Sequence, residues 1–459
     1  MGSVGLAVSV VCRRLASRCI TTVLVVTCTV AWPLVAGAQD GDRWIGTWAT
    51  GPVSLQSSPA STTNQVNQSP QIHDQTVRQV VRLSIGGFKL RVLFTNQYGT
   101  EPLKIAAAHI AIRQTDAMIV ESSGRVLTFN GEESVTLERG ATHLSDPVEL
   151  GVPSLSEIAI DVYLPGDMGT TASLVTTHRT GLSTTYLSSS GDHTGVSEFP
   201  VDATVQSWFF LSRVEVSTKT AAGAIVTIGD SITDGTSSTP DTNSRWPDFL
   251  AERLVDVMGD AAFGVLNVGI GGNRVLSDNG GMVAIQRRGA PPGPDDVIPD
   301  PTAFFGPSAL SRFDRDVLLQ PGVTHVIVLE SINDVGFAFD NDWPSVQDLI
   351  AGHTALVQRA HARGLRIYGG TLTPFEGAVT FSETGEVKRQ AFNQWLRTNS
   401  PYDAVIDFDA AIRDSAHPRR ILAAYNPGDS IHCNDAGYRA MAEAVDLALF
   451  ESRLALLSR

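Results

Sequence analysis

The sequence predicts two unlike halves, an all-β sandwich domain followed by an α/β domain built around a parallel sheet. From about Trp44 to Val216, apolar and polar residues alternate and are interrupted by Gly, Pro, Asn and Ser, which is typical of short, half-buried strands. From Ala224 onward, apolar runs alternate instead with amphipathic stretches. That alternation indicates β-α-β units, in which helices cover both faces of a parallel sheet.

In the first half, the clearest strand patterns lie in four short segments. Val77–Ile85 and Phe88–Thr95 are separated by Gly86-Gly87, and a two-residue glycine turn between two such runs predicts a β-hairpin. Glu157–Leu164 and Trp208–Val216 are the other two predicted strands. Strong helical periodicity is absent here, which favours a β-sandwich.

The second half is predicted to alternate buried strands with amphipathic helices. The strands are Ala224–Ile228, Gly264–Val268, Thr324–Leu329, Leu365–Thr371 and Ala404–Phe408, and the helices are Trp246–Met258, Val346–Arg363, Glu386–Asn399 and Asp435–Phe450. Ser217–Gly223 is a short linker. The predicted division is therefore a leader at residues 1–38, a β-sandwich accessory domain at 39–218 and an α/β domain at 222–459.

The leader has the pattern of a cleaved signal peptide. A basic region precedes the mostly apolar stretch Ile20–Val35 and the small-residue site Ala36-Gly37-Ala38, which places cleavage before Gln39. The basic residues are Arg13, Arg14 and Arg18. We therefore expect a secreted or periplasmic protein without a membrane span in its mature chain. An uncleaved anchor is one alternative, although Pro33 interrupts the apolar run, and a twin-arginine signal is another.

Composition argues against several partners and bound groups. The formal net charge of -14 argues against nucleic acid or an anionic membrane surface as a partner. Of the four cysteines, three lie in the leader and Cys433 alone lies beyond it, so no internal disulfide is expected. None of the histidines has metal-ligand spacing, and His353 and His361 are expected on the surface of one helix, so no metal is predicted.

One segment, Gly289–Pro301, is unusually rich in proline and aspartate. A loop of this length inside a compact domain is typically functional or disordered. It follows the second predicted strand of the sheet, so it is placed to overhang a site at the sheet edge. A solvated surface excursion is the alternative interpretation.

The most informative motif is Gly229-Asp230-Ser231-Ile232-Thr233-Asp234-Gly235, directly after the predicted strand Ala224–Ile228. A strand that ends in a glycine-bounded turn presents Ser231 at the carboxyl edge of a sheet, where open α/β folds place their chemistry. A serine alone is a poor nucleophile and needs a nearby base. The motif lacks the G-x-S-x-G spacing, which argues against the α/β-hydrolase fold.

Two further motifs follow the next two predicted strands. Asn267–Asn273 is rich in glycine, and Gly272 is a candidate backbone donor to an oxyanion, with an ordinary tight turn as the alternative. Its spacing differs from G-x-G-x-x-G, which argues against a dinucleotide cofactor. Asn333, within Glu330–Asp334, can aim its side-chain amide at an oxyanion, although Asn-Asp pairs are also frequent in turns.

The last motif, Asp429-Ser430-Ile431-His432, holds a carboxylate and an imidazole in one loop. The Asp429 carboxylate can accept the Nδ1–H of His432 and fix the tautomer in which the other ring nitrogen acts as a base. A capped helix start is the alternative, but Asp435 fits the cap of the final predicted helix better.

Together and in this order, the four motifs resemble those of the SGNH (GDSL-type) hydrolase family. They are G-D-S-I, N-x-G with a following G-G-N, S-I-N-D and D-x-x-H, and they span about Ala224–Phe450. The resemblance implies a flavodoxin-like parallel three-layer sandwich and hydrolysis of carboxylic esters without a cofactor. The first half also looks like the non-catalytic β-domain of some secreted members, with Trp44–Trp48 at its start.

The resemblance also implies roles for individual residues. Ser231 would be the nucleophile, His432 the base and Asp429 the residue that orients the base. The oxyanion hole would consist of the backbone N–H groups of Ser231 and Gly272 together with the side chain of Asn333.

Three positions depart from the family pattern. Ile232 replaces the usual Leu, which we expect to be harmless, and Cys433 stands where Pro is frequent after the histidine. Ser331 stands where Gly is common, and its side chain is expected to crowd the turn that carries Asn333.

The predicted function is that of a secreted carboxylic ester hydrolase whose substrate is an ester. Deacetylation or deacylation of carbohydrates and cleavage of small or lipid-like esters are both compatible with the motifs. An acyltransferase with the same triad is an alternative, as is a glycan-binding protein whose hydrolase domain is degenerate. Export beside a β-domain favours a carbohydrate ester, which is an argument from architecture.

Overall fold

The computed structural model describes residues 43–58, 68–70, 72–168, 174–278, 305–337 and 344–451. The chain divides into two compact units, Met1–Gly41 and Asp42–Arg459, and all of the described residues belong to the second. The predicted signal peptide (residues 1–38) and the proline-rich segment Gly289–Pro301 lie outside the described residues. Within those residues, no helix has the length and apolar character needed to cross a membrane.

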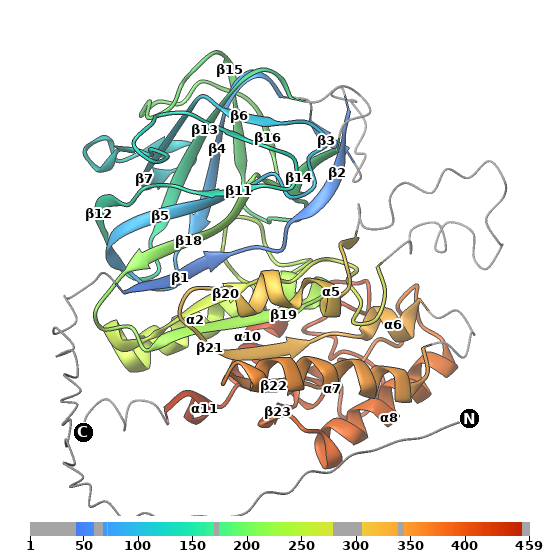
Figure 1. Ribbon diagram of the computed structural model, residues 1–459. Helices are drawn as coiled ribbons and strands as arrows, with labels where there is room; N and C mark the ends of the chain where they lie inside the picture. Colours follow the sequence, from blue (N-terminus) through green and yellow to red (C-terminus); the bar gives the residue numbers. More distant parts are fainter. Residues whose placement is uncertain are drawn as a thin grey trace, which may run out of the picture. The chain divides into compact units, whose positions relative to one another are not determined.

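The first half is strand-rich, as predicted (Figure 1), and its strands pair antiparallel apart from β2 and β3. One sheet contains β1 (Trp44–Ala49), β18 (Leu211–Ser217), β5 (Gly87–Thr95), β11 (Thr142–Leu144) and β12 (Val148–Val152). A second contains β16 (Val201–Val205), β15 (Thr185–Ser190), β4 (Ile72–Arg82), β13 (Glu157–Met168), β7 (Ala107–Thr115), β8 (Met118–Ile119) and β9 (Arg125–Val126).

Shorter elements complete this half. They are β17 (Trp208–Phe209), β14 (Leu174–His178), β2 (Val53–Ser58) and β3 (Gln68–Pro70) in one sheet, β10 (Val135–Leu137) paired with β6 (Leu103–Ile105), and the single turn η1 (Glu121–Ser123). Strand β2 pairs antiparallel with β14 and parallel with β3. The end of β14 is the part of this half that contacts the candidate site.

The predicted hairpin through Gly86-Gly87 is wrong, because β4 and β5 lie in different sheets. After β4 the backbone donors turn to other partners: Leu83 N–H donates to Ser156 O and Ser84 N–H to Thr47 O. Gly86 is needed for a close approach, since a Cβ there would overlap the Val152 carbonyl oxygen. A chain that crosses between sheets keeps the period of two on both sides of the crossing, so the pattern alone does not separate it from a hairpin.

The second half contains the predicted parallel sheet. Its strands lie in the order β20 (Phe263–Asn267), β19 (Gly223–Gly229), β21 (Val323–Leu329), β22 (Arg366–Gly370) and β23 (Ala404–Ile406), and every pair is parallel. Numbered along the chain, this order is 2-1-3-4-5, which reverses direction beside β19. The first strand, β19, is buried along its whole length, as expected for a strand with neighbours on both sides.

Helices pack on this sheet in two groups. The helices are α1 (Ser231–Asp234), α2 (Trp246–Met258), α5 (Ala309–Phe313), α6 (Ile332–Gly336), α7 (Val346–Ala362), α8 (Glu383–Asn399), α9 (Phe408–Ile412), α10 (Asp435–Glu443) and α11 (Ala448–Glu451), with the short turns η2 (Gly259–Ala261) and η3 (Asp314–Leu318). In one group α10 contacts α2 and α9, and in the other α7 contacts α5 and α8.

The final predicted helix, Asp435–Phe450, is in fact two helices, α10 and α11. The Asp446 carboxylate accepts the Ala448 N–H and so begins the second one. The cap of α10 is Asn434 rather than Asp435, because the Asn434 side chain accepts the Gly437 N–H. Asp435 instead accepts the Thr239 N–H.

Contact between the β-rich half and the sheet includes close approaches of the two backbones. Strand β1 runs beside β20 (Figure 1), and a Cβ on Gly264 would collide with the Gly46 carbonyl oxygen. The Gly46 N–H donates to Pro321 O at 2.9 Å, and the Val265 N–H donates to Ser84 Oγ at 2.8 Å. These contacts hold β1 against the edge strand β20 of the parallel sheet.

Candidate active site

Ser231 is the first residue of α1, directly after the buried strand β19. The Asp230 side chain caps this single turn by accepting the Ile232 N–H at 2.9 Å, and Gly235 ends it at a φ of 98°. Glycine readily adopts the left-handed backbone conformation that this position requires. The glycine-bounded turn therefore presents the Ser231 hydroxyl at the carboxyl edge of the sheet.

The loop before α10 brings His432 and Asp429 to this serine. His432 Nε2 lies 2.8 Å from Ser231 Oγ, and His432 Nδ1 lies 2.7 Å from Asp429 Oδ2. The other oxygen of Asp429 accepts the N–H groups of Ile431 and His432, each at 3.0 Å. The three residues thus form a continuous hydrogen-bonded chain.

The charge of Asp429 determines the tautomer of His432. Burial opposes ionisation, but the hydrogen bond and charge of His432 and the two backbone donors outweigh it and hold the pKa of Asp429 below its ordinary value. An ionised carboxylate can only accept hydrogen bonds. His432 therefore carries its proton on Nδ1, and Nε2 accepts the Ser231 O–H.

The other two predicted site residues lie at the ends of the neighbouring strands. Gly272 follows β20 at a φ of 79°, and a Cβ there would overlap the Phe305 ring. Asn333 lies in the first turn of α6, after β21, and its amide donates to Asn273 O at 2.9 Å. Strands β20, β19 and β21 are adjacent, so these residues share one sheet edge with Ser231. The Asn333 amide has a second N–H donor without a protein acceptor among the described residues.

Ser331 adopts a backbone conformation that suits glycine, with a φ of 100° and a ψ of -2°. Its hydroxyl lies 3.0 Å from Nε2 of His353, whose Nδ1 lies 2.7 Å from the Tyr402 hydroxyl. His353 was expected on the surface but is buried. Burial lowers the pKa of His353 to about 3, so it is a neutral hydrogen-bonding group beneath the turn that carries Asn333.

Three acidic side chains are buried behind the catalytic edge. Burial raises the pKa of Asp230 to about 7 and that of Asp334 to about 6, and it raises the pKa of Glu330 well above its ordinary value. The negative charges of neighbouring acids add to the shifts of Asp230 and Glu330. Because the raised pKa values favour protonated carboxyl groups near neutral pH, the negative charge behind Ser231 is smaller than that of three ionised carboxylates.

Arg312 ties the strand ends together and was not singled out from the sequence. Its guanidinium donates to the carbonyl oxygens of Gly229 and Val268, to the Asn273 side chain and to Asp316. Arg312 lies in no sequence motif, and its burial is visible only in the structure.

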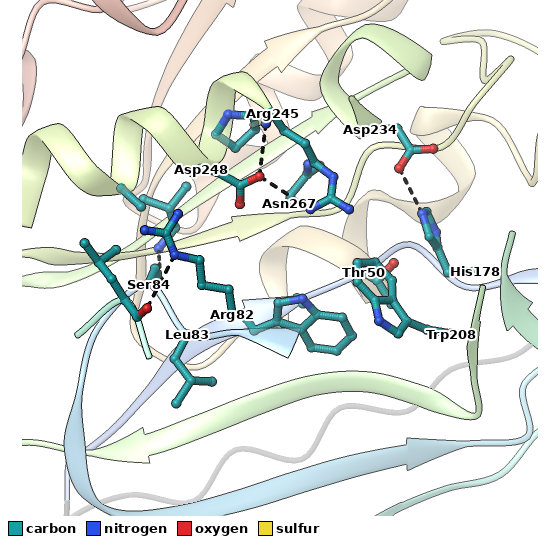
Figure 2. A pocket seen from close by; sticks show the side chains of 16 residues that line it. Thr50, Arg82, Leu83, Ser84, His178, Trp208, Asp234, Arg245, Asp248 and Asn267 are labelled. Carbon is teal, nitrogen blue, oxygen red and sulfur yellow. Dashed lines mark hydrogen bonds and ion pairs between the residues drawn. The ribbon is translucent and has the colours of Figure 1, made fainter. Parts of the chain in front are cut away.

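The β-rich half contacts the site through the last residue of β14 and the residues just after it. His178 Nε2 lies 2.9 Å from Asp234 Oδ1, and the Thr180 hydroxyl donates to Asp234 Oδ2 at 2.6 Å. Figure 2 shows His178 pointing toward Asp234 at one side of a pocket that is also lined by Trp208 and Arg245. Ser231 and His432 are not among the residues that line this pocket. Sequence reasoning treated Asp234 as part of a turn and gave His178 no role.

Cys433 is buried and unpaired, and burial raises the pKa of its thiol to about 12. The thiol is therefore a small packed group beside the loop of His432. Across the described ranges, no group of three or more His, Cys, Asp or Glu side chains is arranged to hold a metal ion.

Comparison with known proteins shows a family similarity in the second half of the chain. Residues 227–440 match the model of the GDSL-like Lipase/Acylhydrolase family, and no curated protein matches the chain. An acetylxylan esterase from Geobacillus stearothermophilus is 21% identical, with a TM-score of 0.33 over 49% of this chain and 93% of that chain. A GDSL-like lipase from Bacteroides thetaiotaomicron is 15% identical, with a TM-score of 0.32 over 50% of this chain and 89% of that chain.

The matched segment begins in β19 and ends in α10. It contains Ser231, Gly272, Asn333, Asp429 and His432, while the strand-rich half lies outside it. Structural similarity at the level of the two enzymes above says nothing about the substrate of this chain. The family match makes the α/β half of the chain similar to the GDSL-like lipase/acylhydrolase family, and it supports a carboxylic ester hydrolase.

Proposed function

We propose that the protein hydrolyses carboxylic esters through an acyl-enzyme formed on Ser231. The observation that carries the proposal is the chain of hydrogen bonds from Asp429 through His432 to Ser231, with distances of 2.7 Å and 2.8 Å. A serine hydroxyl needs an adjacent base that a third group orients, and these three side chains have that geometry.

The proposed reaction has two steps. His432 Nε2 takes the Ser231 proton as Oγ attacks the ester carbonyl, and His432 then gives this proton to the leaving alcohol. Water, deprotonated by the same nitrogen, attacks the acyl-enzyme and releases the acid and free Ser231. Asp429 stays ionised throughout and stabilises the imidazolium that forms in each step.

The oxyanion that develops in both steps needs donors that are in place beforehand. We assign this role to the backbone N–H groups of Ser231 and Gly272 and to the Asn333 side chain. The bond from the Asn333 amide to Asn273 O supports the assignment, because it holds the amide in one orientation. Each such donor is worth roughly 3 kcal/mol in comparable sites.

We further propose that the enzyme is exported and that a carbohydrate ester is its substrate. Export is supported by the signal-peptide pattern of residues 1–38. The strand-rich half beside the catalytic half favours a carbohydrate over a lipid surface, which is an argument from architecture. Within the described residues, the large exposed apolar side chains Phe88, Val257 and Val379 lie on β5, on α2 and in the loop before α8, respectively.

The test is hydrolysis of p-nitrophenyl esters of increasing acyl length by the protein and by Ser231→Ala, with Ser415→Ala as the matched control at an exposed serine. We expect cleavage that favours acetate, is lost in Ser231→Ala and is unchanged in Ser415→Ala. A preference for long chains would indicate a lipase-like enzyme. Equal activity in Ser231→Ala would refute the proposal, and products that require an added sugar acceptor would indicate an acyltransferase.

A further inference from the structure

Asn273, the residue directly after the proposed donor Gly272, is completely buried. Its side-chain amide donates to Phe305 O at 2.8 Å and to Pro307 O at 2.9 Å, and its side-chain oxygen accepts the Arg312 Nε–H at 3.0 Å. A buried amide with unmade hydrogen bonds is costly, and here both the nitrogen and the oxygen have protein partners. These bonds hold the Asn273 side chain in one position.

The backbone of Asn273 is bonded as well. Its N–H donates to Ile270 O at 3.0 Å, which closes the turn after β20, and its carbonyl oxygen accepts the Asn333 amide at 2.9 Å. An amide is planar and the Asn333 side chain has two N–H groups, so a bond at one N–H also sets the direction of the other. Asn273 thus joins the turn that carries Gly272 to the helix that carries Asn333.

Arg312 extends this connection to the strand that carries the nucleophile. It is buried on α5 and donates to Gly229 O and Val268 O as well as to the Asn273 side chain. Gly229 ends β19, two residues before Ser231, and Val268 directly follows β20. Because the donors of a guanidinium form a rigid fork, Arg312 sets the spacing of these two strand ends.

The bonding pattern of Asn273 differs from that of a residue that only fills the core. Fully buried residues are most often apolar, whereas Asn273 bonds to the segment before α5, to α5 itself and to α6. Oxyanion donors must lie about 2.7–3.1 Å from the oxyanion, and a misplacement of about 1 Å can cost about 100-fold in rate. A residue that links these elements therefore controls where the donors lie.

We propose that Asn273 is a positioning residue that holds the backbone of Gly272 and the amide of Asn333 in the geometry of the oxyanion hole. The inference rests on the proposed ester hydrolysis at Ser231 and adds a residue to its machinery. Asn273 acts through the two donors and not by contact with the substrate. Because the donors stabilise a charge that develops in the transition state, the loss of Asn273 should lower kcat rather than raise KM.

Asn273→Ala tests the inference through steady-state kinetics with p-nitrophenyl acetate. We expect kcat to fall about 10- to 100-fold and KM to change less than about threefold. The matched control is Asn96→Ala, at a buried asparagine of the β-rich half whose amide donates to Glu101 O and Leu137 O. The control should lose a similar amount of stability in thermal unfolding and keep kcat within about twofold.

A double variant separates positioning from a general loss of structure. Residues that act through the same group have non-additive effects, so Asn273→Ala should lower kcat by a smaller factor in an Asn333→Ala background than in the wild-type protein. Equal factors in both backgrounds would mean that Asn273 does not act through Asn333 and would overturn the inference. An unchanged kcat in Asn273→Ala, or a loss confined to KM, would overturn it as well.

Asn273→Asp is the second variant, for the case in which Asn273→Ala does not fold. It has the same shape and keeps an acceptor for Arg312, but a carboxylate cannot donate to Phe305 O and Pro307 O. We expect a fall in kcat here too, and failure of both variants to fold would limit Asn273 to a structural role and overturn the inference. If hydrolysis by the wild-type protein does not depend on Ser231, the proposed function itself fails, which distinguishes the two failures.

Discussion

In the α/β half, the candidate site consists of short motifs at the carboxyl ends of adjacent strands, whereas in the β-rich half it consists of single residues at and just after the end of β14. Ser231, Gly272 and Asn333 follow β19, β20 and β21, and each lies in a motif that is legible in the sequence. His178, Arg179 and Thr180 lie in no motif, yet two of them, His178 and Thr180, bond to Asp234, three residues after the proposed nucleophile Ser231.

The difference teaches how the two kinds of residue are constrained. A reacting group must stand at a strand end with a particular turn around it, so its neighbours in the sequence are constrained as well. A supporting residue needs to arrive from a surface that packs against the site, and its sequence neighbours are free to vary. The following predictions test whether the reacting groups lie in the α/β half and the β-rich half contributes supporting residues.

The largest effect is expected for Asp429→Asn in the α/β half. An amide that donates to His432 Nδ1 leaves the proton on Nε2, so the imidazole no longer accepts the Ser231 proton. We expect kcat to fall about 10³- to 10⁴-fold with little change in stability. Steady-state kinetics with p-nitrophenyl acetate checks this, with Asp256→Asn, an exposed aspartate on α2, as the control. A loss below about tenfold would exclude Asp429 as the orienting residue.

Asn333→Ala should have the second-largest effect. The amide serves the oxyanion that forms in the transition state, so kcat should fall about 10²- to 10³-fold while KM changes little. The same assay measures both constants. If the substitution raised KM and left kcat unchanged, Asn333 would be a ground-state binding residue instead.

Sequence reasoning succeeded where one local pattern determines one local structure. The parallel sheet followed from continuous apolar runs such as Ala224–Ile228, and the serine turn followed from the glycines around it. It failed where the outcome depends on distant partners. Gly86-Gly87 looks like a hairpin turn because the Val152 backbone, which Gly86 approaches, is remote in sequence. His353 looks like a surface residue of α7 because Ser331 and Tyr402, its buried partners, lie on other elements.

His178→Phe is the corresponding test in the β-rich half. It keeps an aromatic ring but removes the partner of Asp234 Oδ1 and of Gly51 O, which should destabilise the protein by about 2–3 kcal/mol. Activity toward neutral esters should fall about tenfold, because Asp234 also accepts the Gly271 N–H next to the proposed oxyanion donor. Thermal unfolding and kinetics check this, and His361→Phe, at an exposed histidine on α7, is the matched control.

The pH dependence of stability sharpens the His178 test. Burial favours the protonated form of Asp234, but His178, Thr180 and Arg245 outweigh burial and lower the pKa of Asp234 from its ordinary 3.8. A carboxylate with a lowered folded-state pKa contributes stability above pH 3.8 that is lost as the pH falls below this value. The loss should be smaller in His178→Phe. Equal acid-induced losses in both proteins would show that His178 does not stabilise the ionised Asp234.

The smallest effect is expected at Ser331. The feature tested there is the backbone conformation of Ser331 and not a contact between the two halves. Ser331→Ala keeps the φ of 100° and loses the hydrogen bond to His353, whereas Ser331→Gly loses the same bond but relieves the left-handed strain. We therefore expect the Gly variant to be more stable than the Ala variant by about 1 kcal/mol. Both should keep kcat within about threefold, because the Asn333 amide remains bonded to Asn273.

Denaturant unfolding of both variants measures this order directly. If Ser331→Ala were the more stable of the two, the left-handed conformation would carry no strain in this turn. The departure from the family's glycine would then be neutral for the backbone. If Gly is the more stable, the hydroxyl of Ser331 offsets a strained turn by bonding His353, and the chain keeps Asn333 in place with a residue that its conformation disfavours.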